Sequence, residues 1–286
     1  MSIIRVVSYN IHKGRSGLIS RARLNELRLG LHGVGADLVF LQEVQGRNDR
    51  ASILDAQHES LAAALRLDVA YACNAVRQHT EHGNALLSRF PILGFENLDI
   101  SDHRMEQRGL LHAQVRVRGL DVHCFVVHLG LFALSRNRQA EALIQRIESS
   151  VPPECPIIIA GDFNDWTDDL SATLVKRLNL YEVFASVQQP RGAGMPRLRE
   201  TVQMLRQSLL EVRGRPRVLR GAPQLGSGGL APTARPPRTF PSALPWFRLD
   251  RIYQRGFAVR SARVLRGRPW TMLSDHVPLL TDLELP

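Results

Sequence analysis

Short apolar runs that end in a polar residue recur along the whole chain. Runs rich in valine, isoleucine and leucine are typical of buried strands, and a polar residue that stops such a run lies at the rim of a sheet. The motifs are VVSYN, LVFLQE, VVHL, IIIAGDFN, LDRIY and SDH, with the polar residues Asn10, Glu43, His128, Asp162, Asn164, Asp250, Asp275 and His276. If these rims converge, the carboxylates, histidines and amides form one site. Such a set of side chains can bind a divalent cation and transfer protons, and it therefore suits phosphoester hydrolysis.

The spread of these motifs favours a single domain over residues 1–286. At 286 residues with 44% apolar composition, the chain is long enough to bury a sizeable core. No stretch approaches the roughly 18 to 20 consecutive apolar residues of a membrane span, and the start of the chain lacks the features of a secretory signal. We therefore expect a monomeric cytoplasmic protein without a transmembrane segment. We interpret Cys73, Cys124 and Cys155 as buried free thiols.

The positive charge of the chain is concentrated in one segment. The formal net charge is +10, and residues 191–238 alone hold ten arginines and two glutamates. Glycine and proline are frequent there, so we expect a basic insertion at about 189–237 in a surface loop, with an amphipathic helix at Arg197–Val212 and a flexible tract at Gly214–Pro237. Arginine suits phosphate recognition, and a preference for arginine throughout the genome explains the composition equally well.

The order of the apolar periodicities predicts an α/β protein. A strand at Ile3–Tyr9, a helix at Ser20–Val34 and a strand at Asp37–Val44 form the usual parallel pair with a crossover helix. The further predicted helices are His58–Arg66 and Leu134–Ser149, and the further predicted strands are Asn84–Leu87, Ile92–Ile100, Leu110–Arg118, Asp121–Leu129, Pro156–Ala160, Leu249–Tyr253, Ala258–Leu265 and Val277–Leu285.

Two motifs offer carboxylates at strand ends. Asp162 and Asn164 stand two residues apart, so both side chains point to the same side of an extended backbone. Gly161 allows a sharp turn there, which favours a site, although Asp and Asn also cap ordinary turns. Glu43 emerges from a buried strand and must be paired, protonated or bound to a cation, and one of the many arginines is the alternative partner.

The remaining motifs are ambiguous one at a time. Asp275 and His276 are neighbours that reach different partners only if the backbone bends, and a turn or helix cap is the simpler interpretation. His128 fits a core histidine as well as a catalytic one. Asp250 inside a strand needs a partner, and a histidine held by an aspartate gains a fixed tautomer and a higher basicity. Their co-occurrence in one chain is what points to a site.

Taken in order, these motifs resemble those of the endonuclease/exonuclease/phosphatase superfamily, the DNase I-like metal-dependent phosphoesterases. The matching elements are the N-terminal asparagine, the Gln-Glu and His-Leu motifs, Gly-Asp-Phe-Asn, Leu-Asp-Arg-Ile and the terminal Ser-Asp-His. The resemblance covers Ile3 to about Tyr181 and Arg238 to Glu284, and it is closest to a small cytoplasmic bacterial branch. It implies a four-layer α/β sandwich of two packed mixed β-sheets flanked by helices (DNase I-like), with the site at one open edge of the sheets.

The resemblance also implies a mechanism. Glu43, Asp275 and Asn10 would hold one Mg²⁺ or Mn²⁺ ion, which offsets the charge that builds on the phosphate. His276, oriented by Asp250, would remove a proton from the attacking water.

Other residues would act on the phosphate and the leaving group. Asp162 would position the water, Asn164 would donate to the phosphate, and His128 would stabilise or protonate the leaving oxygen on the opposite side. Arg108 matches a family position that contacts phosphate, and an ordinary surface arginine is the alternative. Two further residues expected near the substrate are His12 and Lys13.

The sequence leaves the substrate open. The arginine-rich segment favours DNA or RNA, because it would add a phosphate-binding face. The same basic helix suits peripheral contact with an anionic membrane, and an exposed hairpin at Pro241–Phe247 would suit a phospholipid head-group phosphodiesterase. An inositol or sugar phosphatase is a further alternative. A non-catalytic nucleic-acid or membrane binding module is the alternative of a different class, although no expected site position is lost.

Overall fold

The computed structural model describes residues 2–15, 23–48, 56–76, 78–103, 106–186 and 236–286. The predicted basic insertion at about 189–237, with its amphipathic helix and flexible tract, lies outside these residues apart from its last two positions.

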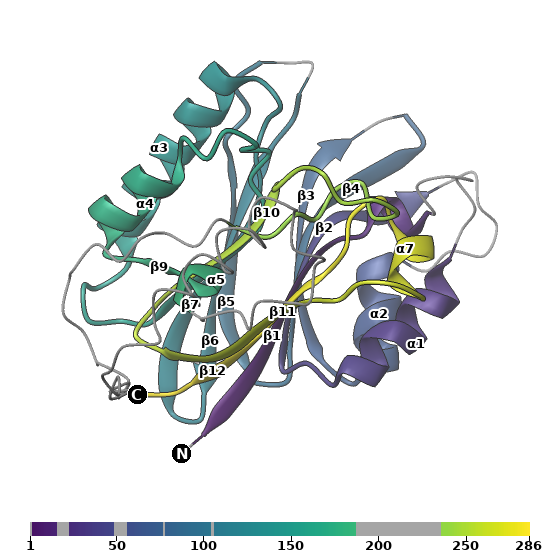
Figure 1. The fold of residues 1–286 in the computed structure, drawn as a ribbon, viewed down its shortest axis with the longest axis horizontal. Coiled ribbons are helices and arrows are strands. Elements are labelled where there is room, and N and C mark those ends of the chain that lie inside the picture. The colour runs from purple at the N-terminus through teal and green to yellow at the C-terminus, as the bar shows by residue number, and fades with distance from the viewer. Residues whose placement is uncertain (1, 16–22, 49–55, 77, 104–105, 187–235) are drawn as a thin grey trace, which may run out of the picture. The chain divides into compact units, whose positions relative to one another are not determined.

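Two mixed β-sheets of six strands form the centre of the fold (Figure 1). The first has the order β11-β12-β1-β2-β4-β3, with β1 Ile3–Asn10, β2 Leu38–Asn48, β3 Asp68–Val76, β4 Thr80–Ser88, β11 Ala258–Val264 and β12 Leu279–Glu284. The second has the order β5-β6-β7-β8-β10-β9, with β5 Ile92–Asp99, β6 Gly109–Val117, β7 Leu120–His128, β8 Ile157–Asp162, β9 Tyr181–Glu182 and β10 Asp250–Arg255. Among these described strands, β1 with β2 and β7 with β8 are parallel pairs, and the other pairs are antiparallel.

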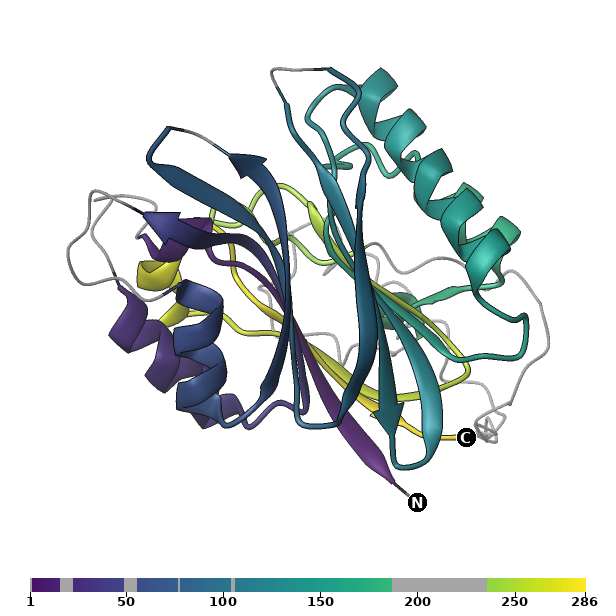
Figure 2. The same ribbon diagram turned by 180° about the vertical axis from the view of Figure 1, so that it is seen from behind.

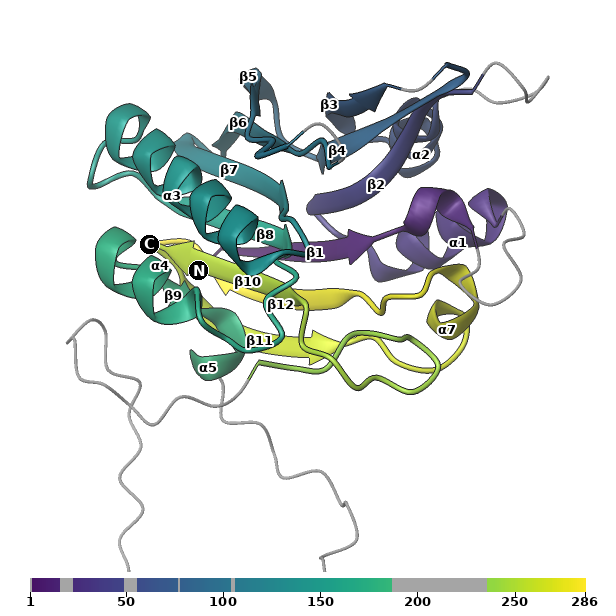
Figure 3. The ribbon, with the colours of Figure 1, turned by 90° about the horizontal axis from the view of Figure 1, so that it is seen from above.

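The two sheets pack face to face, and helices cover their outer faces. The core between the sheets contains buried side chains from both, including Ile4, Phe40, Leu86, Val126 and Ile158. α1 Leu24–Val34 and α2 Gln57–Leu65 pack on the first sheet, and α3 Ala133–Ser150 and α4 Ser171–Leu178 pack on the second (Figures 2 and 3). A sheet must bury each apolar face against another layer. The predicted four-layer α/β sandwich is confirmed.

The sequence pattern misses β3 and α4. The buried positions of β3 are alanines, namely Ala70, Ala72 and Ala75, and alanine is depleted in strands, so the alternation is invisible in the sequence. Helix α1 begins at Leu24 rather than at Ser20, since Arg23 precedes it as the cap residue. The remaining short elements are η1 His12–Gly14, α5 Val183–Ser186 and α7 Trp270–Leu273.

None of the three cysteines, all within the described residues, forms a disulfide, but only one of them is buried as expected. Cys124 lies in the core, whereas Cys73 and Cys155 are half-buried, because Cys73 lies on the edge strand β3 and Cys155 lies in the loop before β8. None of the helices in the described ranges is long and apolar enough to cross a membrane.

Candidate active site

Strand register brings three predicted site residues side by side. In the second sheet, β8 lies between β7 and β10, and the pairing places Asp162 next to His128 on one side and next to Asp250 on the other. In the first sheet, Asn10 at the end of β1 pairs with Gln42 of β2. The strands β1 and β2 contact β8 across the sandwich. The polar ends of these strands therefore meet at one edge of the fold.

Glu43 leaves the regular strand through a β-bulge. The register between β2 and β4 shifts between Leu41 and Val44, so β2 carries one extra residue there. Glu43 has a φ of +53°, a left-handed conformation that costs a non-glycine residue about 1 to 3 kcal/mol. Its carboxylate lies 3.5 Å from Nζ of Lys13, and the side chain is 23% exposed. The strained backbone therefore presents a carboxylate from a buried strand to the open edge.

Gly161 is required by the close approach of β7 and β8. Its φ is +154°, and an added Cβ would lie 1.9 Å from the carbonyl oxygen of Val127. The chain then turns, and the backbone N–H of Asn164 donates to Oδ1 of Asp162 at 2.9 Å. The side-chain amide of Asn164 donates to the carbonyl of Leu129 at 2.9 Å. The Gly-Asp-Phe-Asn segment thus forms a turn that fixes both polar side chains at the edge.

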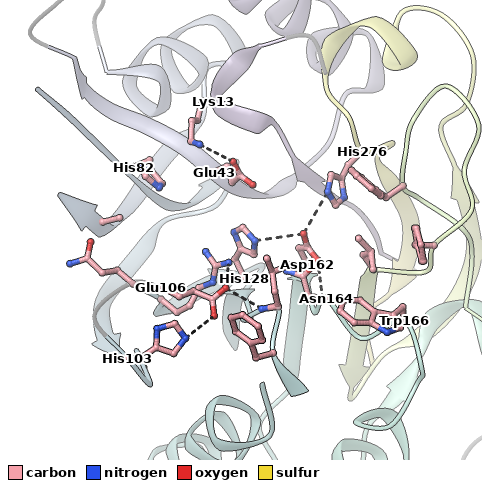
Figure 4. Close-up of a pocket in the computed structure, with 18 residues that line it drawn as sticks. Lys13, Glu43, His82, His103, Glu106, His128, Asp162, Asn164, Trp166 and His276 are labelled. Atoms are coloured by element: carbon pink, nitrogen blue, oxygen red, sulfur yellow. Dashed lines mark hydrogen bonds and ion pairs between the residues drawn. The ribbon is translucent and has the colours of Figure 1, made fainter. Parts of the chain in front are cut away.

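A chain of polar contacts links the two sheets. Nδ2 of Asn10 donates to Oδ2 of Asp162 at 3.1 Å and to Oε1 of Glu43 at 3.3 Å. Nε2 of His276 lies 3.6 Å from the same Oδ2, and Nε2 of His128 lies 3.7 Å from it (Figure 4). Asn10 and Asp162 are both buried. Residues from both ends of the chain therefore form one polar cluster.

His276 and Asp250 form a buried hydrogen-bonded pair. Nδ1 of His276 lies 2.9 Å from Oδ2 of Asp250. Burial opposes the charged imidazole, but the negative charges of Asp250, Asp162 and Asp275, together with the hydrogen bond to Asp250, outweigh it and raise the pKa of His276 to about 10. The aspartate therefore orients the ring and makes it more basic.

Burial acts in opposite senses on Asp162 and His128. It raises the pKa of Asp162 to about 6, helped by the charge of Asp250 and opposed by His276. Burial also lowers the pKa of His128 well below its usual value, together with the positive charge of Arg108. His128 is therefore a neutral imidazole at pH 7, which can donate a hydrogen bond.

The backbone bends between Ser274 and His276. Oγ of Ser274 donates to the carbonyl of Asn10 at 2.7 Å and accepts the N–H of His276 at 3.3 Å. The carboxylate of Asp275 lies 2.7 Å from Nδ1 of His12. Burial raises the pKa of Asp275, but the hydrogen bond from His12 outweighs it, so the pKa is lowered. The two neighbours thus reach different partners.

The cluster opens into a cavity of about 660 Å³ (Figure 4). The predicted residues in its wall are Lys13, Glu43, Arg108, His128, Asp162, Asn164 and His276. Asn10, Asp250 and Asp275 do not line it, although Asn10 contacts Glu43 and Asp250 holds His276. The cavity wall therefore carries most of the predicted residues, Asn10 and Asp250 each contact a wall residue, and Asp275 contacts His12 and Ser274 behind the wall.

Other wall residues are not predicted by the sequence, and they lie mostly on loops. They include His103, Glu106, Phe132 and Trp166, whereas His82 lies on β4. Glu106 accepts from Nη2 of Arg108 at 3.0 Å and from the backbone N–H of Leu131 at 3.1 Å. The loop residues do not end apolar runs, so strand-end reasoning does not find them. Glu106 is nevertheless only two residues from the predicted Arg108.

Two groups of side chains offer ligands for a divalent cation. The predicted group of Glu43, Asp275 and Asn10 provides oxygen donors, which Mg²⁺ and Mn²⁺ prefer, and its two carboxylates are 23% and 26% exposed. The ligand atoms of a second group lie within 4.8 Å of one another, and its members are Asp162, Asp250 and His276, all buried. The second group already uses one histidine nitrogen in a hydrogen bond. The first group also has partners within the protein, since Asp275 contacts His12, Glu43 contacts Lys13 and the amide oxygen of Asn10 accepts the N–H of His12. Its donors are oxygen atoms alone, which suits a hard cation.

The model of the Endonuclease/Exonuclease/phosphatase family matches residues 7–276. The chain belongs to this family. Members of the family are generally hydrolases of phosphoester bonds. The uncharacterized protein YbhP of Escherichia coli strain K12 is 33% identical over 289 residues, which cover 98% of this chain and 96% of YbhP.

Solved structures of family members share the fold. The family protein from Beutenbergia cavernae DSM 12333 superposes with a TM-score of 0.70 at 21% identity, covering 100% of this chain and 72% of that protein. The one from Bacteroides vulgatus has a TM-score of 0.69 at 17% identity, with full coverage of both chains. D. rerio TDP2 in complex with a single-strand DNA product has a TM-score of 0.63 at 18% identity, covering 99% of this chain and 100% of TDP2. The predicted DNase I-like fold is confirmed.

Proposed function

We propose that the protein is a divalent-metal-dependent phosphodiesterase that cleaves a P–O bond by in-line attack of water. The observation that carries this proposal is that the hydrogen-bonded pair of His276 and Asp250 meets the carboxylates of Asp162 and Glu43 around one cavity. A base, a carboxylate that positions water and an oxygen ligand for a cation are the parts that such a hydrolysis needs.

His276 is the proposed general base. Asp250 holds Nδ1, so Nε2 faces Asp162 at 3.6 Å. A water that donates one hydrogen bond to Asp162 would lie within reach of Nε2, which then removes the second proton as the oxygen attacks phosphorus.

Three further residues of the cavity wall would act on the phosphate and the leaving oxygen, namely Asn164, His128 and Arg108. One amide hydrogen of Asn164 is taken by the carbonyl of Leu129, and the other is available to a phosphate oxygen. His128 is neutral and would donate through Nε2 to the leaving oxygen, which fits a stabilising role better than that of an acid. Arg108 adds a positive charge, and its buried Nε has no hydrogen-bond partner within the part of the chain that the structure describes.

Glu43 and Asp275, with the amide oxygen of Asn10, would hold the Mg²⁺ or Mn²⁺ ion. The ion would supply positive charge to the phosphate and would offset the carboxylate charge that raises the pKa of His276. Lys13, beside Glu43, would bind a further phosphate oxygen.

For the substrate, the sequence favours DNA or RNA through arginines that lie mostly outside the described residues. In support, D. rerio TDP2 forms a complex with a single-strand DNA product on the same fold. A phospholipid head group is the second candidate. It is favoured by the described residues themselves, because exposed apolar side chains surround the cavity.

Hydrolysis of bis-p-nitrophenyl phosphate tests the reaction without assuming the natural substrate. We expect Mg²⁺-dependent release of p-nitrophenol that excess chelator abolishes, and a loss of about 10² to 10⁴ in rate for His276→Ala. His32→Ala is the matched control, since His32 is exposed on α1. Full activity in the chelator would remove the metal assignment, and full activity of His276→Ala would remove the base assignment.

A further inference from the structure

Two segments that contribute residues to the cavity wall carry a group of exposed apolar side chains. They are Leu131, Phe132, Leu134, Leu244, Trp246 and Phe247, each between 42% and 74% exposed, and they are named here the apolar rim. One group lies at the start of α3, and the other precedes β10. Leu131, Phe132 and Phe247 themselves line the cavity. Both segments therefore border the cavity.

Exposed apolar residues are concentrated in and beside the cavity wall, and this concentration calls for a functional explanation. Within the part of the chain that the structure describes, fifteen large apolar side chains are exposed, and seven of them are the apolar rim and Trp166, which also lines the cavity. Isolated exposed apolar residues are ordinary on protein surfaces, whereas a contiguous group marks an interaction surface. A small soluble diester has no use for such a surface.

We propose that the apolar rim inserts into the interfacial layer of a phospholipid bilayer and brings a lipid phosphate to the cavity. The most exposed residues of the rim are the leucines Leu134 and Leu244, at 74% and 73%. Single-stranded nucleic acid is bound by stacking of bases on aromatic rings, and leucine cannot supply that contact. Leucine, phenylalanine and tryptophan beside basic residues are typical of surfaces that lie in a membrane interface.

An exposed arginine lies beside each part of the rim. Arg138 is exposed and follows Leu134 by four residues on α3, so both lie on one face of the helix, and its guanidinium is paired with Asp102 at 2.7 Å. Arg238 is exposed as well, and its guanidinium lies 5.8 Å from the ring centroid of Trp246. Arginine at the level of the head groups attracts anionic lipids. The rim therefore combines apolar tips with Arg238 beside Trp246 and with the Arg138–Asp102 pair beside Leu134, and Arg238 is the cation that would attract an anionic bilayer.

This inference rests on the proposed function in one respect, namely that the group hydrolysed in the cavity is a phosphodiester. With the rim inserted, the phosphodiester of a lipid would enter the cavity while the acyl chains remain in the bilayer. The energetic cost of extracting a lipid into water would then be avoided.

Vesicle binding by the full chain tests the surface. The variant is Leu134→Ser/Leu244→Ser/Trp246→Ser, none of whose residues lines the cavity, and the control is Leu29→Ser/Phe95→Ser, which removes comparably exposed residues that also do not line it. The vesicles contain equal amounts of phosphatidylglycerol and phosphatidylethanolamine, at an ionic strength that screens binding by distant basic residues.

We expect the rim variant to bind the vesicles at least about tenfold more weakly than the wild type, because it lacks three apolar side chains whose transfer from water into the bilayer favours binding. The control should bind as the wild type does, and all three proteins should hydrolyse bis-p-nitrophenyl phosphate at the same rate. Equal vesicle binding by the rim variant and the wild type would overturn the proposal, as would a wild type that does not bind vesicles.

Two further measurements separate the rival explanations. Lipids with brominated acyl chains should quench wild-type tryptophan fluorescence, and the absence of quenching would count against insertion. A rim variant that loses affinity for a single-stranded DNA oligonucleotide but not for vesicles would assign the surface to nucleic acid instead. His276→Ala should keep vesicle binding and lose hydrolysis, so failure of the proposed reaction and failure of the membrane surface give different results.

Discussion

Nδ1 of His276 and Oδ2 of Asp250 lie 2.9 Å apart and join the two sheets at the site. Asp250 begins β10 of the second sheet, and His276 lies in the bend that leads into β12 of the first. The contact is buried at both ends. It therefore fixes the ring of the proposed base against a rigid strand rather than against a loop.

Replacing Asp250 by asparagine should lower kcat by about 10- to 100-fold, because a neutral partner no longer fixes the tautomer of His276 or raises its basicity. Asp250 raises the pKa of His276, so the acidic limb of the pH–rate profile should move to lower pH in Asp250→Asn. Steady-state kinetics on bis-p-nitrophenyl phosphate from pH 5 to about 10 measures both effects.

Asp121→Asn serves as the control, since Asp121 is paired with Arg116 at the β6–β7 hairpin and does not line the cavity. An Asp250→Asn profile with the wild-type shape would mean that the pair is structural and that His276 is not the base.

Glu43→Gln should weaken Mg²⁺ binding at least about tenfold, because an amide is a poorer ligand for a hard cation than a carboxylate. Isothermal titration of Mg²⁺ into Glu43→Gln and Asp250→Asn compares the two candidate ligand groups directly. The opposite ranking, with Asp250→Asn the weaker binder, would place the cation in the buried group of Asp162, Asp250 and His276. Glu96→Gln, with a side chain that is 66% exposed, is the control.

The sequence predicts the site residues that sit at strand ends, since their position follows from two simple rules. Asn10, His128 and Asp162 each stop an apolar run, and adjacent strands that end at the same edge must bring their last residues together. Glu43 follows the same rule, but the bulge that turns its carboxylate outward has no sequence signal. The left-handed backbone there carries glutamate rather than glycine or asparagine.

The loops of the site are not predictable in this way. Phe132 and Trp166 line the cavity because α3 and the turn after β8 are held against the second sheet, which is a tertiary effect. Within that arrangement, the guanidinium of Arg136 lies 4.9 Å from the ring centroid of Trp166 and its Nη1 donates to the carbonyl of Leu131. One buried arginine thus connects two loops of the cavity. No local sequence pattern predicts this connection.

Gly161→Ala should destabilise the fold by about 3 kcal/mol or more, because the new Cβ would lie 1.9 Å from the carbonyl oxygen of Val127 and neither backbone can yield without breaking a strand pair. Gly94→Ala is the control, since Gly94 lies on the edge strand β5 with no atom within 4 Å of the added carbon. Urea unfolding of both variants gives the difference. Equal midpoints would show that β7 and β8 do not approach so closely in solution.

The buried Glu182 should make stability depend on pH. Burial raises its pKa from 4.5 to about 7, although the charge of Arg251 opposes the shift. A carboxyl whose folded pKa lies above its unfolded value binds more protons when folded, so its contribution to stability is full below pH 4.5 and is lost as the pH rises through 7. The loss is about 3 kcal/mol from the size of this shift.

Glu182→Gln keeps the shape without the ionisation, so its unfolding free energy relative to the wild type should rise by that amount between pH 4 and about 8. Glu96→Gln, at an exposed position, is the control. A Glu182→Gln protein that follows the wild-type pH dependence would show that burial does not shift the ionisation of Glu182.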